Sequence, residues 1–194
     1  MTVIRVNPES VRAYGSDAQA RFEAIRAELI SLVTAVTEVR YFGPNAVDFK
    51  TRSGQMAADF ANKLTQDMGA IAEAIRTSTT NIASSLGGAP VVIDVAGGTI
   101  SPPAVQSVDY VDVDTSALES LKGVVDRHFS MIIDSFEQHL QRLLSTDWQG
   151  NAREQAVSQV QGFTATAKSR AAEAQASLNQ YISSQLQSVT TADR

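Results

Sequence analysis

Asp147-Trp148-Gln149-Gly150-Asn151 is the stretch that decides the fold, because it ends one long apolar heptad pattern and precedes another. Trp148 is the only tryptophan in the chain. It lies two residues before a glycine, which can adopt the positive φ that reverses a chain. Asn151 can then accept hydrogen bonds from the first free amides of a following helix. The stretch therefore predicts a tight turn between two helices.

Apolar residues spaced alternately by three and four flank this turn on both sides, which is typical of helices packed along a hydrophobic seam. Before the turn, the seam consists of Leu118, Leu121, Val125, Phe129, Ile132, Phe136, Leu140 and Leu143. After it, the seam consists of Ala156, Val160, Phe163, Ala167, Ala171, Ala174, Leu178, Ile182, Leu186 and Val189. Residues 114–194 are thus predicted to form a helical hairpin. Asp114 or Ser116, the latter in a capping box with Glu119, would begin its first helix, and residues 190–194 would be a frayed tail.

The first half of the chain shows the same order of features. Asn7, Pro8 and Glu9 are residue types that favour a helix start, and a helix is expected from there to about Arg40. Its seam consists of Val11, Tyr14, Ala18, Phe22, Ile25, Leu29, Leu32, Val36 and Val39. After a bend, a second seam reaches about Leu86 through Phe49, Ser53, Met56, Phe60, Leu64, Met68, Ile71, Ile75 and Ile82. Residues 1–86 are therefore predicted to form another hairpin.

The bend of this first hairpin is Tyr41-Phe42-Gly43-Pro44-Asn45. Pro44 disfavours a helical conformation of the residue before it, and Gly43 allows the turn. The stretch aligns with the Trp148 turn if one residue is inserted. Tyr41 then takes the place of the tryptophan, and Gly43 that of Gly150.

Residues 87–113 separate the two hairpins and cannot be helical throughout, because they contain three of the five prolines and the pair Gly97-Gly98. They are predicted to be a linker. Val91–Val95 and Val108–Val111 have the composition of strands, so a small hairpin or an extended segment packed on the helices is expected there.

Charge and composition exclude several classes of partner. The net charge is -5, and Lys and Arg form no cluster, so nucleic acid and anionic lipid are not expected partners. There are no cysteines, which excludes disulfides and thiolate metal sites. The first residues lack the apolar core of a signal peptide, and no apolar run is long enough to span a bilayer.

No catalytic chemistry is expected from the residues. His128 and His139 have no carboxylate or second histidine three or four positions away, so no metal site is predicted. A nucleophile elbow, a phosphate-binding glycine loop and a cysteine nucleophile are all missing from the sequence. We therefore predict no catalytic residue, no metal and no cofactor.

The Trp148–Gly150 turn between two amphipathic helices resembles the turn of the WXG family, small helical hairpins exported by type VII (ESX) secretion systems. The alternative is an ordinary hairpin that has a tryptophan at its corner. In the family, two hairpins pair antiparallel with their turns at opposite ends. The resemblance implies an all-α, antiparallel four-helix bundle made of two fused hairpins. The linker agrees with this, since helices of about thirty residues span roughly 45 Å and about twenty-five extended residues reach about 80 Å.

The family also carries a Tyr-x-x-x-Asp/Glu element after the second helix of one partner, which acts together with the Trp-x-Gly turn of the other as an export signal. At that place this chain has Tyr181 and Gln185, so an amide replaces the carboxylate. Tyr110 and Asp114 have the right spacing, but they lie in or next to the linker, where Asp114 is already expected to cap a helix. Both elements are weak candidates, and apolar neighbours favour Tyr181 as a core residue.

The resemblance implies a non-enzymatic substrate or adaptor of type VII secretion, from an actinobacterial source and associated with virulence. Its partners would be the secretion machinery, through an ATPase or a chaperone, and a co-secreted protein. It would be cytoplasmic before export and then secreted or held in the cell envelope. We expect a monomer, because each hairpin covers the other. The alternatives are a membrane-active, pore-forming protein, which the acidic balance disfavours, and an intracellular structural bundle.

Overall fold

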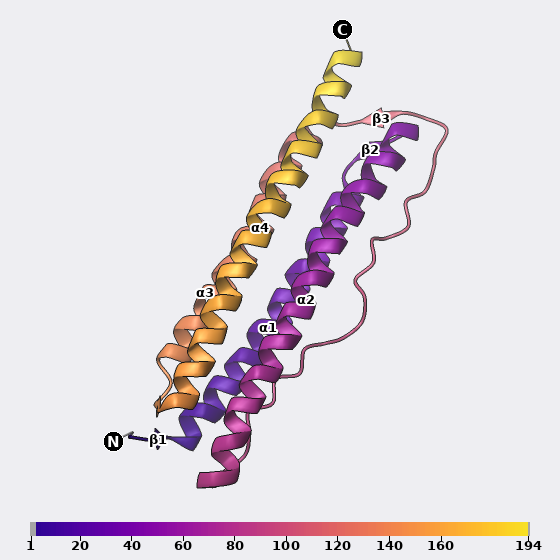
Figure 1. Ribbon diagram of the computed structural model, residues 1–194. Helices are drawn as coiled ribbons and strands as arrows, with labels where there is room; N and C mark the ends of the chain where they lie inside the picture. Colours follow the sequence, from indigo (N-terminus) through magenta and orange to yellow (C-terminus); the bar gives the residue numbers. More distant parts are fainter. Residues whose placement is uncertain (1–2, 194) are drawn as a thin grey trace. The chain divides into compact units, whose positions relative to one another are not determined.

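A computed structural model describes residues 3–193, without the side chains of residues 84–86. Four helices make up most of the chain (Figure 1), and they confirm the predicted all-α four-helix bundle. The helices are α1 (Pro8–Glu38), α2 (Pro44–Leu86), α3 (Thr115–Leu144) and α4 (Asn151–Ala192). Four two-residue strands adjoin them: β1 (Arg5–Val6), β2 (Tyr41–Phe42), β3 (Asp112–Val113) and β4 (Trp148–Gln149).

The two first helices of the hairpins begin at capping side chains. Asn7 Oδ1 accepts hydrogen bonds from the amides of Glu9 (3.0 Å) and Ser10 (3.2 Å), as predicted. Asp114 Oδ1 accepts from the amides of Ser116 (3.0 Å) and Ala117 (3.2 Å). Asp114 is thus the cap of α3. Ser116 instead donates its hydroxyl to Asp114, at 2.6 Å.

Three predicted helix ends differ from the structure. α1 ends at Glu38 rather than near Arg40, because the next residues extend to form β2. Asn151 does not cap α4 but is its first residue, and the carbonyl of Gly150 accepts the first helical bond, from the amide of Glu154. α4 continues to Ala192, so residues 190–192 of the predicted tail are helical and largely exposed. Arg194 of that tail, like the Leu86 side chain at the end of the second seam, lies outside the described residues.

The two chain reversals have the same local structure, and we call them the Trp turn (Trp148–Gly150) and the Tyr turn (Tyr41–Gly43). In each, the aromatic amide donates to the carbonyl two residues before it, at 2.8 Å. In each, a glycine with positive φ follows, at 122° in the Trp turn and 126° in the Tyr turn. After the glycines, Pro44 and Asn151 both begin a helix.

The two turns therefore correspond residue by residue, and the insertion assumed in the sequence alignment is unnecessary. Tyr41 matches Trp148, and Gly43 matches Gly150. We call this ungapped correspondence, continued along the chain in both directions from the turns, the repeat register.

Each turn is bound to the start of the other hairpin. The Trp turn pairs antiparallel with β1, where Val6 lies opposite Trp148, and the cap Asn7 donates its amide to the carbonyl of Asp147 at 2.9 Å. The Tyr turn pairs with β3, where Val113 lies opposite Tyr41. The cap amide of Asp114 correspondingly donates to the carbonyl of Arg40 at 3.3 Å. The repeat register relates these two arrangements as well.

The chain divides into two compact units, and each contains parts of all four helices. Unit 1 consists of Met1–Arg26, Leu64–Gly97 and Ile133–Lys168, and unit 2 of Ala27–Lys63, Gly98–Ile132 and Ser169–Arg194. Unit 1 holds the Trp turn with the start of α1, and unit 2 holds the Tyr turn with the start of α3. The predicted hairpins, residues 1–86 and 114–194, are instead continuous in sequence. Their division into separate domains stays a prediction.

The predicted seams form most of the core. Every seam position predicted for the first helix is buried, and so are most of the seam positions predicted for the other three helices. The exception in α3 is position 140. His139 is fully buried, whereas Leu140 is half-buried, so the seam runs through the histidine. The repeat register explains this, because it matches His139 to the seam residue Leu32.

The linker does not form the hairpin considered from its sequence, but the other alternative, an extended segment packed on the helices, is confirmed for residues 90–102, which we call the strap. Val91, Ile93 and Ile100 are its buried side chains. Asp112–Val113, beyond the predicted strand segments, forms the short strand β3. Glycines make room for the strap in each unit. A Cβ on Gly15 would lie 2.8 Å from Val91 in unit 1, and one on Gly54 would lie 2.9 Å from Pro102 in unit 2.

We expect Gly54→Ala to destabilise the protein by about 1–3 kcal/mol, because its Cβ would also lie 2.7 Å from the Thr37 methyl group. Gly123→Ala is the matched control. Gly123 is helical, and a Cβ there would meet nothing within 4 Å. That change should stabilise by about 0.5–1 kcal/mol through helix propensity. Urea denaturation measures both, and a Gly54→Ala protein as stable as Gly123→Ala would show that the strap is loosely held.

Candidate functional site: the two aromatic-glycine turns

The Trp turn of unit 1 is a packed structure rather than an exposed loop. Only 2% of the Trp148 surface is exposed to solvent. The amide of Asp147 donates to the Ser10 hydroxyl at 2.9 Å, which ties the turn to the first turn of α1. Ile4 lies over Gly150, where a Cβ would be 3.6 Å from its side chain. The positive φ of Gly150 is confirmed, and the ring is more deeply buried than the partial burial expected for it.

The Tyr turn of unit 2 has the same arrangement with different side chains. Tyr41 is buried, and its ring centroid lies 5.9 Å from that of Phe49. Val111 covers Gly43 as Ile4 covers Gly150, because a Cβ on Gly43 would lie 3.1 Å from the valine. Burial is the first cause that raises the pKa of the Tyr41 hydroxyl above its ordinary value. Tyr41 is therefore neutral at physiological pH.

The Tyr181 element lies against the Tyr turn. Gln185 Nε2 donates to the hydroxyl of Tyr41 at 2.7 Å. The ring of Tyr181 stacks on Phe49 at 5.4 Å, and the guanidinium of Arg52 lies 5.3 Å from the centre of the tyrosine ring. Gln185 thus contacts Tyr41, and Tyr181 contacts Phe49 beside it, so the Tyr181 element lies at the turn of the first hairpin.

A groove of about 670 Å³ opens beside this contact in unit 2. The Tyr turn, β3 and the last turns of α4 line it, with Phe42, Val113, Gln185 and Val189 among its walls. Lys50 lies beside the Tyr turn, and its ammonium is 4.7 Å from the centre of the Phe42 ring. Burial of Lys50 lowers the pKa of its ammonium. The groove thus has apolar side chains in its walls, and a cation flanks the turn that borders it.

Tyr110 and Asp114, the second candidate export element, have separate structural roles. Asp114 caps α3, and its pKa is held below the ordinary value, chiefly by the hydrogen bond from the Ser116 hydroxyl. Tyr110 is 58% exposed, and its ring lies 6.1 Å from that of Phe42. Tyr110 and Asp114 both lie next to β3, but one packs on the Tyr turn and the other serves the helix. The capping role expected for Asp114 is confirmed.

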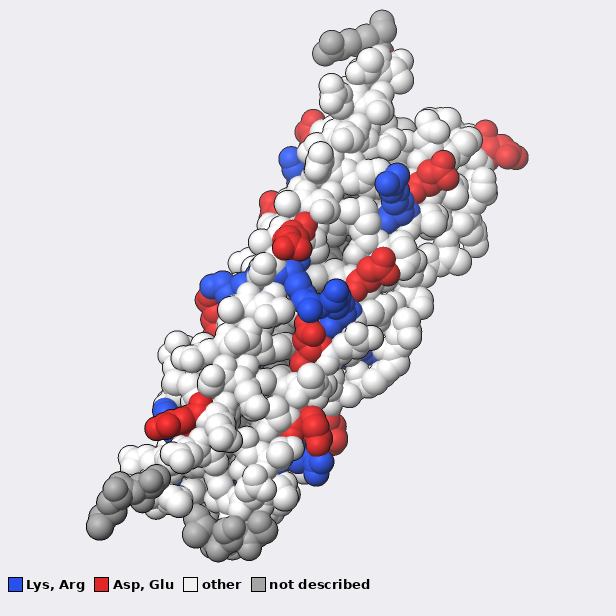
Figure 2. Space-filling view, in the orientation of Figure 1, with Lys and Arg blue, Asp and Glu red and all other residues white. Residues whose placement is uncertain are grey.

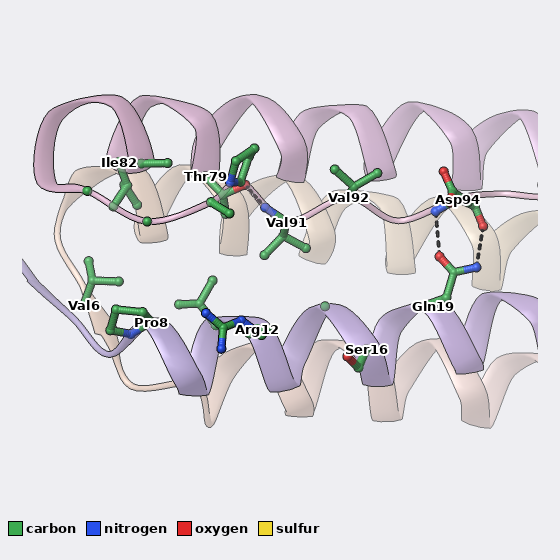
Figure 3. A pocket seen from close by; sticks show the side chains of 17 residues that line it. Val6, Pro8, Arg12, Ser16, Gln19, Thr79, Ile82, Val91, Val92 and Asp94 are labelled. Atoms are coloured by element: carbon green, nitrogen blue, oxygen red, sulfur yellow. Dashed lines mark hydrogen bonds between the residues drawn. The ribbon is translucent and has the colours of Figure 1, made fainter.

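Unit 1 has a groove of about 530 Å³, and the strap crosses it (Figure 3). The side-chain amide of Gln19 makes two hydrogen bonds to the backbone of Asp94, one from its nitrogen (2.8 Å) and one to its oxygen (2.6 Å). Thr79 Oγ1 accepts from the amide of Val91 at 2.8 Å. In unit 2 the amide of Asn62 grips the backbone of Ile100 in the same two-point manner, at 2.8 and 2.7 Å. These side chains satisfy backbone groups that have no strand partner.

A buried polar pair in unit 1 could not be found from local motifs. The Tyr14 hydroxyl and His139 Nε2 share a hydrogen bond of 2.9 Å, and Phe22 packs edge-on against the imidazole. His139 Nδ1 has no hydrogen-bond partner among the described residues. The histidine therefore has one side-chain hydrogen bond, to Tyr14, and its burial disfavours the charged form. Its match to Leu32 in the repeat register is the signal that would have placed it in the core.

The described residues offer no alternative site of another kind. Within residues 3–193, no three His, Asp or Glu side chains are grouped so that they could hold a metal ion. Over the same range, no helical stretch combines the length and hydropathy that crossing a bilayer would need. Acidic and basic side chains are interspersed on the face shown in Figure 2, where most of the surface is uncharged. The candidate functional features of the described residues are thus the two turns and the grooves of units 1 and 2.

Comparison with known proteins adds no relative: no family model, no curated protein and no solved structure matches the chain.

Acid should destabilise the protein through His139. Burial, followed by the nearby Arg21 cation, lowers the pKa of His139 from 6.5 to about 4. The unfolded chain therefore binds a proton that the folded chain excludes between these two values. Stability is fully present above pH 6.5 and falls by about 3 kcal/mol as the pH drops to 4.

The control is the double variant Tyr14→Phe/His139→Leu, which removes the titrating group together with its hydrogen-bond partner. Its free energy of unfolding should show a smaller decrease between neutral pH and about pH 4 than that of the parent protein. Equal pH dependence in both proteins would contradict the assignment to His139.

Proposed function

We propose that this chain is a non-enzymatic substrate or adaptor of a type VII secretion system and the single-chain equivalent of a WXG heterodimer. The observation that carries the proposal is the repetition of the aromatic-x-glycine turn. Both turns have the same backbone conformation, and each is bound to the start of the other hairpin. An accidental tryptophan at a helix corner gives no reason for a matching turn at the equivalent place of the other hairpin.

The Tyr turn with Tyr181 and Gln185 is the surface that we propose the secretion machinery recognises. In WXG pairs the export signal combines a tyrosine element of one hairpin with the turn of the other. Here Tyr181 and Gln185 belong to the second hairpin, and Tyr41 belongs to the first. The hydrogen bond from Gln185 to Tyr41 supports a composite of this kind. Both halves are altered, because tyrosine replaces tryptophan and glutamine replaces the carboxylate.

The partners proposed are an ATPase or chaperone of the secretion system and a co-secreted protein. The chain would be folded in the cytoplasm before export and would then be secreted or held in the cell envelope of an actinobacterium, where a role in virulence follows from the family resemblance. Its contribution there would come from surfaces and not from catalysis. A groove bordered by the Tyr turn and the end of α4 supplies such a surface.

Fractionation tests the proposal most directly. The protein is produced in an actinobacterial host with its type VII machinery intact and in the same host without it, and its amounts in cytosol, envelope and medium are measured. We expect export only from the intact host. An unchanged location in the two hosts would favour an intracellular structural bundle, and export from both would indicate another route.

The buried position of Trp148 leads to a prediction that separates folding from recognition. Trp148→Ala should cost about 3–5 kcal/mol in the free energy of unfolding, because it removes a fully buried ring. Trp148→Phe, which keeps part of the apolar volume, should cost less. We expect the secreted amount of each variant to follow its folded fraction. A Trp148→Phe protein that is as stable as the parent protein but is retained in the cell would show that the machinery reads the indole itself.

Position 185 should decide whether the Tyr181 element is active. In Gln185→Glu, a carboxylate can accept a hydrogen bond from the Tyr41 hydroxyl, so the contact is kept with its direction reversed. If export needs the family's carboxylate, this change should raise secretion, and Tyr181→Ala should alter it little in the parent protein. Melting temperatures serve as the control for folding. Loss of secretion in a stably folded Tyr181→Ala protein would instead show that the present tyrosine and amide are read as a variant signal.

A further inference from the structure

Two short segments expose large apolar side chains, and they occupy equivalent positions. Val3 and Ile4 precede β1 in unit 1 and are 67% and 60% exposed. Tyr110 and Val111 precede β3 in unit 2 and are 58% and 73% exposed. The repeat register matches Val3 to Tyr110 and Ile4 to Val111. Four of the most exposed apolar side chains of the described chain therefore belong to one repeated feature.

Each segment leads into a strand whose outer edge is open. β1 and β3 lie in two-stranded sheets, so each has one strand neighbour among the described residues. An open edge next to exposed apolar side chains favours pairing with another strand, unless charge or shape prevents it. The packing of Ile4 on Gly150 and of Val111 on Gly43 holds the segments in place. These contacts and the strand pairs set the position of both edges within their units.

The two edges carry opposite charges at the same position. Arg5 follows Ile4 in one segment, and Asp112 follows Val111 in the other. Within its unit, Arg5 lies 3.6 Å from Asp147, and Asp112 lies 3.1 Å from Arg40. Two β1 edges brought together would place arginine near arginine, and two β3 edges would place aspartate near aspartate. A β1 edge beside a β3 edge, in the antiparallel register that sets Arg5 opposite Asp112, would place opposite charges together and Ile4 and Val6 opposite Val113 and Val111, which favours this pairing.

We propose that copies of this chain associate by pairing the β1 edge of one copy, Val3–Val6, with the β3 edge of another, Tyr110–Val113. The occupant of each edge is a second copy, because the complementary segment is present in the same chain with the same length and apolar order. Exposed charges and short apolar segments stabilise such an interface only weakly. Association is therefore concentration-dependent and sensitive to salt, and the protein is a monomer when dilute. Because the two surfaces differ, every added copy leaves one edge of each kind open.

Sedimentation of the full chain with two matched variants tests the pairing. Val3→Pro blocks the β1 edge, and Tyr110→Pro blocks the β3 edge, since proline removes an amide donor and disfavours strand pairing. Met131→Lys, which changes an exposed apolar residue elsewhere, is the control. Weight-average masses are measured up to protein concentrations on the order of 1 mM, at about 0.05 M and about 0.5 M salt. Circular dichroism melting establishes that each variant is folded.

The parent protein and Met131→Lys should gain mass with concentration at low salt, without a plateau at the dimer, and should lose the gain at high salt. Each proline variant alone should stay a monomer. An equimolar mixture of the two should reach a one-to-one complex and stop there, because each variant has one open edge of a different kind. A parent protein that stays monomeric throughout would overturn the proposal. So would a dimer of either proline variant alone, which would indicate pairing of like edges.

Discussion

The structure depends on one backbone constraint, a glycine in the left-handed region that brings an aromatic strand residue beside the start of the other hairpin. At Gly150, φ of 122° lets Trp148 pair with Val6, and at Gly43, φ of 126° lets Tyr41 pair with Val113. A side chain at either glycine would be strained in that conformation and would also meet the residue that covers it. The positions of both helix caps follow from these turns, because each cap amide donates to the residue before the aromatic.

The two turns have the same backbone conformation, but the side chains at equivalent positions differ. Arg5 and Asp147 form an ion pair at the Trp turn, and at the equivalent places of the Tyr turn the charges are exchanged between Asp112 and Arg40. His139 stands where the other repeat has Leu32, and it is buried without a second hydrogen-bond partner among the described residues. Such differences make the two units chemically distinct although their local backbone is alike. They separate the intact Trp turn from the Tyr turn that meets Gln185.

Much of the fold could be predicted from the sequence, because seam periodicity and turn glycines are local signals. The cap at Asn7 and the buried positions of α1 are direct consequences of such signals. His139 was missed because a histidine adjacent to Leu140 gives no local reason to prefer one position over the other. The contact of Gln185 with Tyr41 joins residues far apart in the chain, and only the expected antiparallel arrangement indicated that these segments would be near each other. Lys50 and Arg52 beside the aromatic rings had no sequence signal at all.

The backbone of the strap is bound by side chains that lie outside the linker, so the linker sequence alone could not predict its path. An extended segment outside a sheet must satisfy its backbone groups without a strand partner, or remain in water. Here side chains of the helices do this, through the two-point contacts of Gln19 with Asp94 and of Asn62 with Ile100. Backbone-directed contacts of this kind leave no pattern in the linker itself, and the helix residues that make them look like ordinary surface amides. The ordering entropy of the strap is offset by its buried apolar side chains, so the segment that joins the hairpins is also part of the core in each unit.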